Sequence, residues 1–179
     1  MSTDTSASPS PTTEQATNVL LIVDAETLLT RYPKPSLDPQ NPTVIEDGFI
    51  FTVGATQGPT PAAKGTCLEL AENSAKTFHL RGRTVGLHAE HSVVFYDLSV
   101  GDARVLSQPQ LVVHNGLTLP APNPETPTEP VAVKADDHYW HCQQLSTGVE
   151  QCELSFMLVN SSCEALGYFS WTVGVKLSG

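Results

Sequence analysis

Basic residues are scarce in this sequence. It has nine lysines and arginines against 19 aspartates and glutamates, which gives a formal net charge of -10 and a sequence pI of about 4.8. The basic residues are scattered along the chain and form no cluster. Because nucleic acids and anionic membranes attract clustered positive charge, the composition argues against both as partners.

Long apolar runs are also missing. No segment approaches the roughly 20 apolar residues that a membrane-spanning helix needs, so we expect no membrane insertion. Residues 1–17 are rich in Ser, Thr and Pro and lack the basic and apolar regions of a secretory signal peptide. We expect them to form a disordered leader, with residues 18–179 forming one domain. The expected location is the cytoplasm, and release by a route that needs no signal peptide is the alternative.

Sequence signatures of catalysis are absent, and we expect a protein that is not an enzyme. The chain has no HExxH, GxSxG or phosphate-cradling glycine loop. No CxxC pair occurs, which argues against a zinc knuckle. His138 and His141 are three residues apart, and on a strand they would face opposite sides, so their spacing does not predict a metal site. The four cysteines, which we expect to be reduced and mostly buried, are Cys67, Cys142, Cys152 and Cys163.

Short segments with strand character make up most of the chain. Lys76–Arg83 alternates, with Phe78 and Leu80 on one side and histidine and arginine on the other, as in a half-buried antiparallel strand. Val19–Val23 is a continuous apolar run, which predicts a strand buried on both faces. Further strands are expected near residues 49–54, 67–70, 91–98, 111–114, 131–133, 137–145, 149–159, 165–171 and 172–177.

This spacing, with almost no helical period, predicts an all-β fold. The expected architecture is a single-domain antiparallel β-sandwich with a short helical turn after the first strand, at Ala25–Arg31. The proline-rich segment Leu119–Pro130 predicts a stiff surface loop between two strands. A sandwich of this kind has exposed edges, and a symmetric homodimer would cover one of them.

Several motifs resemble those of a known family. The segment Asn18–Asp24 reads NVLLIVD, and Tyr32–Thr43 reads YPKPSLDPQNPT. The stretches FTVG at residues 51–54, FHLRGRT at 78–84 and GYFSW at 167–171 follow in order. Together they resemble the PixA/AidA inclusion-body protein family of bacteria over residues 18–177. One departure is Thr172-Val173, where family members often have Asp-Pro after GYFxW.

The resemblance implies a β-sandwich associated with intracellular inclusions and with quorum-sensing-regulated expression. It does not imply a defined biochemical role. The storage of sulphur is unsupported, because methionine occurs only twice.

Acidic and amide side chains lie at expected strand ends and loops. Hard cations such as calcium bind six to eight oxygens gathered from separate loops. The candidate calcium ligands are Asp24, Glu26, Asp38, Asp136 and Asp137. The candidate sugar-binding residues are Asp38, Asn41, Tyr139 and Trp140, whose aromatic rings could stack on a sugar. This hypothesis places the loop after the helix on the same rim as Asp136 and Asp137, whereas the alternative is that the acidic loops only maintain solubility.

Two functions therefore remain open at the level of sequence. One is a non-enzymatic, lectin-like ligand-binding module in which calcium assists carbohydrate binding. The other is a self-assembling storage or inclusion protein that binds no small molecule.

Overall fold

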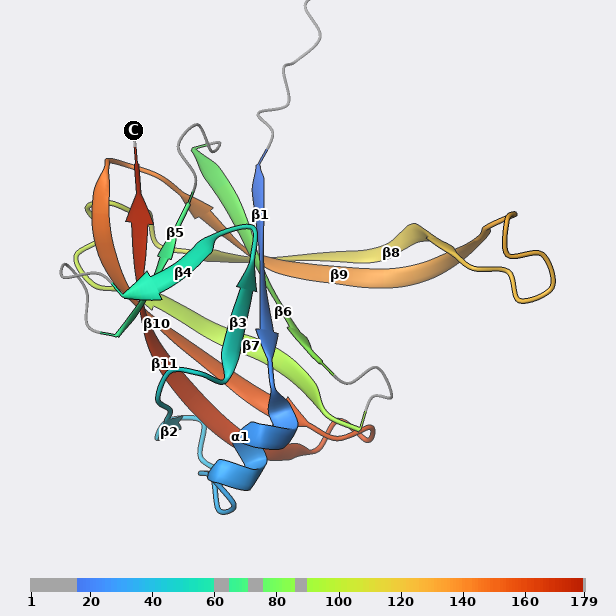
Figure 1. The fold of residues 1–179 in the computed structure, drawn as a ribbon, viewed down its shortest axis with the longest axis horizontal. Helices are drawn as coiled ribbons and strands as arrows, with labels where there is room; N and C mark the ends of the chain where they lie inside the picture. Colours follow the sequence, from blue (N-terminus) through green and yellow to red (C-terminus); the bar gives the residue numbers. More distant parts are fainter. Residues whose placement is uncertain (1–15, 60–64, 71–75, 86–89, 179) are drawn as a thin grey trace, which may run out of the picture.

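The strands form two sheets in a computed structural model that describes residues 16–59, 65–70, 76–85 and 90–178 (Figure 1). Sheet A has the order β3-β1-β6-β9-β8. Its strands are β3 (Ile50–Val53), β1 (Thr17–Val23), β6 (Thr77–Thr84), β9 (Val131–Gln143) and β8 (Gln110–Ala121).

Sheet B has the order β4-β5-β11-β10-β7, and the short strand β2 also pairs with β11. Its strands are β4 (Thr56–Pro59), β5 (Thr66–Glu69), β11 (Ala165–Leu177), β10 (Gly148–Val159), β7 (Ser92–Val100) and β2 (Thr43–Val44). The helix α1 (Ala25–Arg31) follows β1 directly. With seven residues it is short, and no helix in the described ranges is long and apolar enough to cross a membrane.

The predicted sandwich with a short helix after its first strand is confirmed. Most neighbouring strands are antiparallel, but β1 lies parallel to β6, and β11 lies parallel to both β2 and β5. The prediction of an antiparallel sandwich holds for most strand pairings, and these three are its exceptions. Parallel neighbours need a crossover, and the chain supplies one when it passes from β3 through β4 and β5 of sheet B before it returns to sheet A as β6.

The core lies between the two sheets and is centred on aromatic side chains. Phe156 and Phe169 are opposite each other in β10 and β11, with ring centroids 5.4 Å apart. Trp171 is buried beside them, and its indole Nε1 donates a hydrogen bond to Asp47 at 2.8 Å. The GYFSW segment therefore contributes two of the largest fully buried side chains.

The first strand differs from its prediction in two respects. Val19, Leu21 and Val23 are buried, but Leu20 and Ile22 are only half-buried, so β1 faces the core on one side. The strand begins at Thr17, one residue inside the predicted leader. Residues 1–15 lie outside the described ranges, so the prediction of a disordered leader stays untested.

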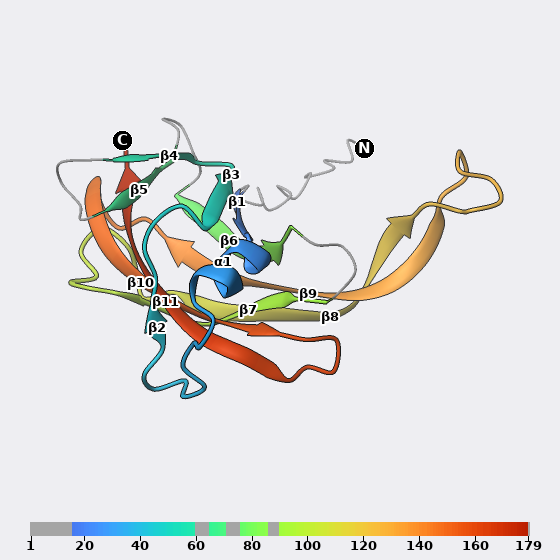
Figure 2. The ribbon, with the colours of Figure 1, turned by 60° about the horizontal axis from the view of Figure 1, so that its bottom comes forward.

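Strands β8 and β9 continue past the body of the sandwich as a two-stranded ribbon (Figures 1 and 2). β9 pairs with β6 from Trp140 to Gln143, but its pairing with β8 runs from His141 to Val131. We call residues 115–136 the arm. The predicted loop at 119–130 is wrong at its start, because β8 extends to Ala121. Proline has no amide donor and occurs in sheets mainly on edge strands, and β8 is an edge strand of sheet A.

Candidate functional site

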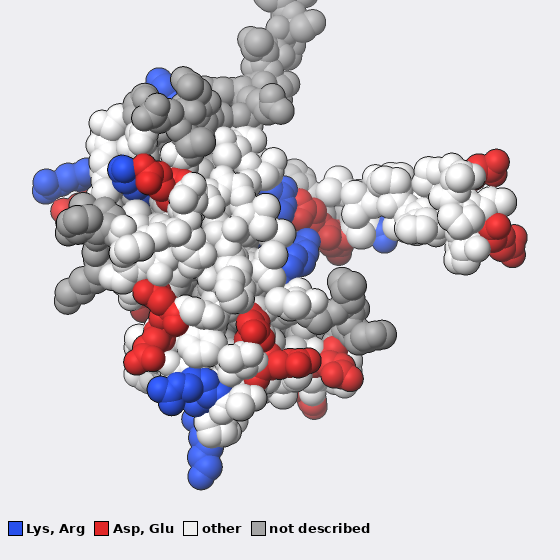
Figure 3. Space-filling model, in the orientation of Figure 1, with Lys and Arg blue, Asp and Glu red and all other residues white. Residues whose placement is uncertain are grey.

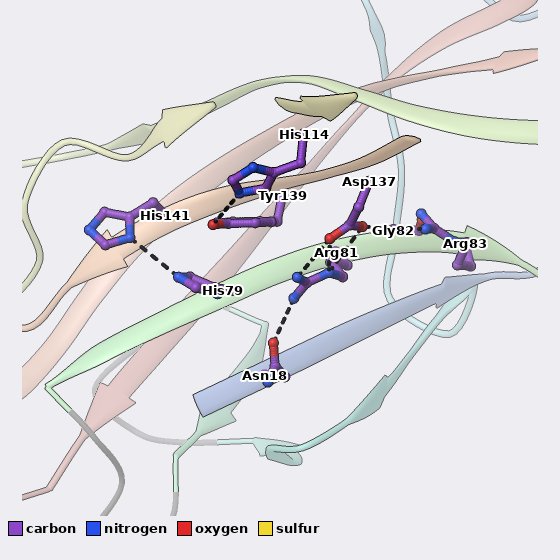
Figure 4. A network of polar contacts seen from close by, with 9 residues as sticks. All are labelled: Asn18, His79, Arg81, Gly82, Arg83, His114, Asp137, Tyr139 and His141. Carbon is purple, nitrogen blue, oxygen red and sulfur yellow. Dashed lines mark hydrogen bonds and ion pairs between the residues drawn. The ribbon is translucent and has the colours of Figure 1, made fainter. Parts of the chain in front are cut away.

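Polar and aromatic side chains gather on the outer face of sheet A, away from the core. They come from four adjacent strands, β1, β6, β9 and β8 (Figure 4). Alternation explains the grouping, because successive strand residues point to opposite faces. On β6, for example, Phe78 and Leu80 face the core, so His79 and Arg81 face outward. We call this set the outer-face cluster, and its members are Asn18, His79, Arg81, His114, Asp137, Tyr139 and His141.

Within the outer-face cluster, Arg81 makes the hydrogen bonds that link its charged and amide side chains. Its Nη2 donates to Asp137 Oδ2 at 2.9 Å, its Nε lies 3.2 Å from the same oxygen, and its Nη1 donates to Asn18 Oδ1 at 2.6 Å. Arg83 adds a longer contact of 3.7 Å to Asp137. These hydrogen bonds, and secondarily the charges of the two arginines, lower the pKa of Asp137 below its usual value. The carboxylate is therefore ionised at neutral pH, with Arg81 as its main partner.

Histidines and a tyrosine form the other half. The rings of His79 and Tyr139 stack with centroids 4.0 Å apart, and the Arg81 guanidinium lies 4.5 Å from the Tyr139 centroid. The Tyr139 hydroxyl is 3.1 Å from Nε2 of His114, and Nδ1 of His141 is 3.4 Å from Nε2 of His79. Partial burial, followed by the nearby charge of Arg81, lowers the pKa of His79. Its imidazole is therefore neutral at pH 7.

Two of the predicted calcium ligands, Asp24 and Glu26, lie at the start of helix α1 and stabilise it. Asp24 is its N-cap, with Oδ1 accepting from the Thr27 amide at 3.1 Å and Oδ2 accepting from the Thr27 hydroxyl at 2.8 Å. Glu26 lies in the first turn, where a negative charge favours the helix dipole. Both residues line a pocket of about 210 Å³ together with Glu90 and His91. In this pocket the two predicted ligands lie near a further acidic residue and a histidine.

Asp38 and Asn41 form a self-contained turn in the proline-rich loop. The Asp38 carboxylate accepts from the Asn41 side chain at 2.7 Å and from the Gln40 amide at 2.9 Å. These two hydrogen bonds lower the pKa of Asp38. The loop is fastened to sheet B by a bridge between Ser36 and Tyr168. Its oxygens are thus used to build the turn.

Asp136 and Asp137 lie in the middle of strand β9, whereas a loop or strand end was predicted for them. Asp136 accepts from the Gly116 amide at 2.7 Å, at the irregularity in β8, whereas Asp137 pairs with Arg81. Trp140 is 8% exposed and donates to the Phe95 carbonyl, so it belongs to the core. Tyr139 faces the opposite side, and the predicted pairing of the two aromatic rings on one sugar-binding surface is wrong. The side chains of adjacent strand residues point to opposite faces of the sheet, so Tyr139 and Trp140 cannot share one surface.

The predicted calcium ligands therefore occupy three places with different partners: the start of α1, the following loop, and β9. In the part of the chain that the structure describes, no three or more His, Cys, Asp or Glu side chains lie close enough together to hold a metal ion. The outer-face cluster was missed as a site, although the alternation around Phe78 had already placed His79 and Arg81 on the outer face. The missing information was which strand lies beside β6.

The arm carries a second candidate surface. On one of its faces the cross-strand pairs are Leu117 with Ala135, Leu119 with Val133, and Ala121 with Val131. The opposite face contains Thr118, whose hydroxyl accepts from Lys134 Nζ at 2.6 Å. We call the first set of six residues the apolar stripe. Its four larger side chains are each 37–42% exposed.

Three of the cysteines, at positions 67, 142 and 152, are buried as predicted, whereas Cys163 is exposed in the turn between β10 and β11. Burial raises the pKa of both Cys142 and Cys152 to about 12. These two thiols are therefore protonated and unreactive at neutral pH. No disulfide joins the described cysteines.

The two packed sheets, the short helix and the projecting ribbon place the chain among the β-sandwich proteins. A family model described as PixA, inclusion body protein, matches residues 15–177. The chain belongs to this PixA family, which confirms the resemblance seen in its motifs.

One solved structure with the same fold is the crystal structure of an inclusion body protein (PixA) from Burkholderia cenocepacia J2315. It superposes with a TM-score of 0.70 at 23% sequence identity, and the match covers 93% of this chain and 99% of that chain. At this identity the likeness establishes the fold alone. A search of curated proteins finds no match.

Proposed function

We propose that this protein is a self-assembling inclusion protein and that the arm joins its copies. The observation that carries this proposal is the apolar stripe on a ribbon that projects from the sandwich. A two-stranded ribbon is at best marginally stable in water by itself, because it buries little apolar surface. Contact with another protein surface would remove the stripe from water and stabilise the arm.

The stripe fits a second copy of itself. It is self-complementary in chemistry, since all six side chains are aliphatic, and a symmetric dimer needs the same patch on both partners. The arm carries few charges beside the stripe: Lys134 and Asp136 lie nearer its base, and Figure 3 shows further acidic residues at its tip. Those acidic residues are Glu125 and Glu129 in the connecting loop. Two arms packed antiparallel would bring each tip to the base of the other arm, where Arg83 lies with half of its side chain exposed.

The net charge of -10 supports this choice of interface. Copies of an acidic protein repel one another over most of their surface. A ribbon that extends away from the body and carries an uncharged apolar stripe lets two copies touch with their bodies held apart. The family's description as inclusion body proteins agrees with an accumulating role, and we infer that the protein accumulates as inclusions within the cell and catalyses no reaction.

Calcium-assisted carbohydrate binding has less support as the alternative function. Its predicted ligands cap a helix, close a turn or pair with arginines, and Trp140 lies in the core. The ring of Tyr139 is already packed against His79 and Arg81. Asp24, Asp38, Asp137 and Tyr139 would each have to give up an existing partner before they could bind calcium or a sugar.

Placing a charge in the apolar stripe tests self-assembly. We expect the unmodified chain to exceed its 19.2 kDa monomer mass in light scattering at micromolar concentration. Leu119→Glu should return the mass to that of the monomer and abolish inclusions in expressing cells, because burying an unpaired carboxylate is costly. Thr118→Glu is the matched control. It adds the same charge one residue away, on the opposite face and beside Lys134, and should leave assembly unchanged.

Circular dichroism must show the same strand content in both variants. A monomeric unmodified chain, or a Leu119→Glu variant that assembles normally, would contradict the proposal. Millimolar calcium should leave the melting temperature unchanged. A clear rise in the melting temperature would favour the calcium-assisted alternative, because a ligand that binds only the folded state stabilises it.

A further inference from the structure

Two histidines of the outer-face cluster face each other across adjacent strands. His79 in β6 and His141 in β9 are directly opposite in the antiparallel pairing. Nε2 of His79 lies 3.4 Å from Nδ1 of His141, and their ring centroids are 5.5 Å apart. Both side chains are only partly buried and lie on the outer face of sheet A (Figure 4).

This separation is the one that a shared metal ion requires. Zinc binds imidazole nitrogen at 2.0–2.1 Å, and two nitrogens at tetrahedral positions on one ion then lie about 3.3–3.4 Å apart. We propose that His79 and His141 form a two-histidine chelate for a borderline divalent transition metal such as Zn²⁺, Ni²⁺ or Cu²⁺. Water would complete the coordination, since the described residues offer no third His, Cys, Asp or Glu ligand at this point. Imidazole suits these metals, whereas calcium prefers oxygen ligands.

The neighbouring side chains hold the first ring in place. Tyr139 stacks on His79, and the Tyr139 hydroxyl is in turn held by His114. Strand pairing fixes both backbones, so little conformational freedom remains to be lost when a metal binds. A preorganised pair of ligands gains affinity because the second contact forms within the same molecule.

The charges in the outer-face cluster also allow a metal cation to bind between the two histidines. Arg81 is the nearest fixed positive charge, but its ion pair with Asp137 at 2.9 Å balances it. The pKa of His79 is lowered, chiefly by burial, so a neutral imidazole is already available at pH 7. Metal binding requires this neutral form. Without metal, a ring N–H of one histidine can donate to the other, and the ion would take the place of that shared proton.

Titration of the metal-free full-length chain with Ni²⁺ tests the site. We expect saturable binding of one ion per chain, measured by calorimetry after treatment with a chelator. His79→Ala and His141→Ala should each raise the apparent dissociation constant at least tenfold, because each leaves a single imidazole. His138→Ala is the matched control, since it removes a histidine from the same strand on the opposite face. Its dissociation constant should stay within twofold of the unmodified chain.

Cu²⁺ provides a second readout that does not depend on affinity. The electron paramagnetic resonance spectrum should show coupling to two imidazole nitrogens in the unmodified chain and to one in either alanine variant. Melting curves of the metal-free variants check that they remain folded. The absence of saturable Ni²⁺ binding up to millimolar concentration would overturn the proposal. So would binding that survives either alanine replacement, as expected if another histidine held the ion.

Discussion

At the scale of single residues, Gly82 shows how closely β6 packs against the core. A Cβ added at this position would lie 2.4 Å from Cε2 of Phe95, and two further ring atoms would be within 2.8 Å. Phe95 is buried and its ring contacts that of Phe156 at 5.7 Å between centroids, so it has little room to move. Gly82→Ala should therefore lower the free energy of unfolding by about 1–3 kcal/mol, as overpacking does in cores.

Urea denaturation followed by tryptophan fluorescence measures this loss. Gly58→Ala is the control, because nothing lies within 4 Å of a Cβ added there. It should change the free energy of unfolding by no more than about 0.5 kcal/mol, as is usual away from packed sites. Equal stability of the two variants would show that Phe95 can move aside.

At the scale of elements, the ion pair between Arg81 and Asp137 joins β6 to β9 where their pairing stops. The last paired residues are Leu80 and Trp140, and beyond them β9 leaves with β8 as the arm. Asp137→Asn should lower the free energy of unfolding by about 1.5–3 kcal/mol, the usual range for hydrogen bonds to a charged group. It should also speed hydrogen exchange in the arm more than in sheet B.

Asp102→Asn is the matched control for this prediction. It removes the partner of Arg104 in an ion pair of 3.8 Å, in which both side chains are more than 70% exposed. Exposed pairs of this kind contribute little, so stability should change by less than about 0.5 kcal/mol. If both variants lost the same stability, the special role of Asp137 at the end of the β6–β9 pairing would be refuted.

The sequence predicted where the strands lie along the chain better than it predicted which strands pair with one another. Alternation around Phe78 correctly separated the core face of β6 from the outer face that carries His79 and Arg81. The partner strand could not be inferred, because His141 is 62 positions from His79 and register over that distance depends on the whole sandwich. The arm was missed for a local reason, since Pro120 reads as a loop residue unless the strand is known to lie at an edge. The acidic residues were proposed as calcium ligands from their positions in the sequence. In the structure, Asp24 caps a helix and Asp38 forms a turn, which are ordinary roles for aspartate.

At the scale of the whole molecule, the outer-face cluster makes stability depend on pH. His79 faces Arg81, His141, His114 and Asp137, and its pKa lies below the usual 6.5 because of burial first and Arg81 second. Between that lowered value and about 6.5 the unfolded chain binds more protons than the folded chain. The free energy of unfolding therefore rises with pH across this window, and acidification from pH 7 costs stability there. Asp137 adds a second loss at lower pH, because the stability it contributes disappears as the pH falls from the usual carboxyl pKa of 3.8 through its lowered pKa in the folded chain.

Urea denaturation between pH 7.5 and pH 5, with a chelator present, measures the histidine contribution. The unmodified chain should lose stability as the pH falls through about 6.5. His79→Gln has no proton to bind, so the difference between the two proteins should shrink or reverse across the same window. His138→Gln, on the opposite face of β9, should follow the unmodified chain. Parallel curves for the unmodified chain and His79→Gln would mean that His79 titrates equally in the folded and unfolded states, and that the acid sensitivity of the sandwich lies elsewhere.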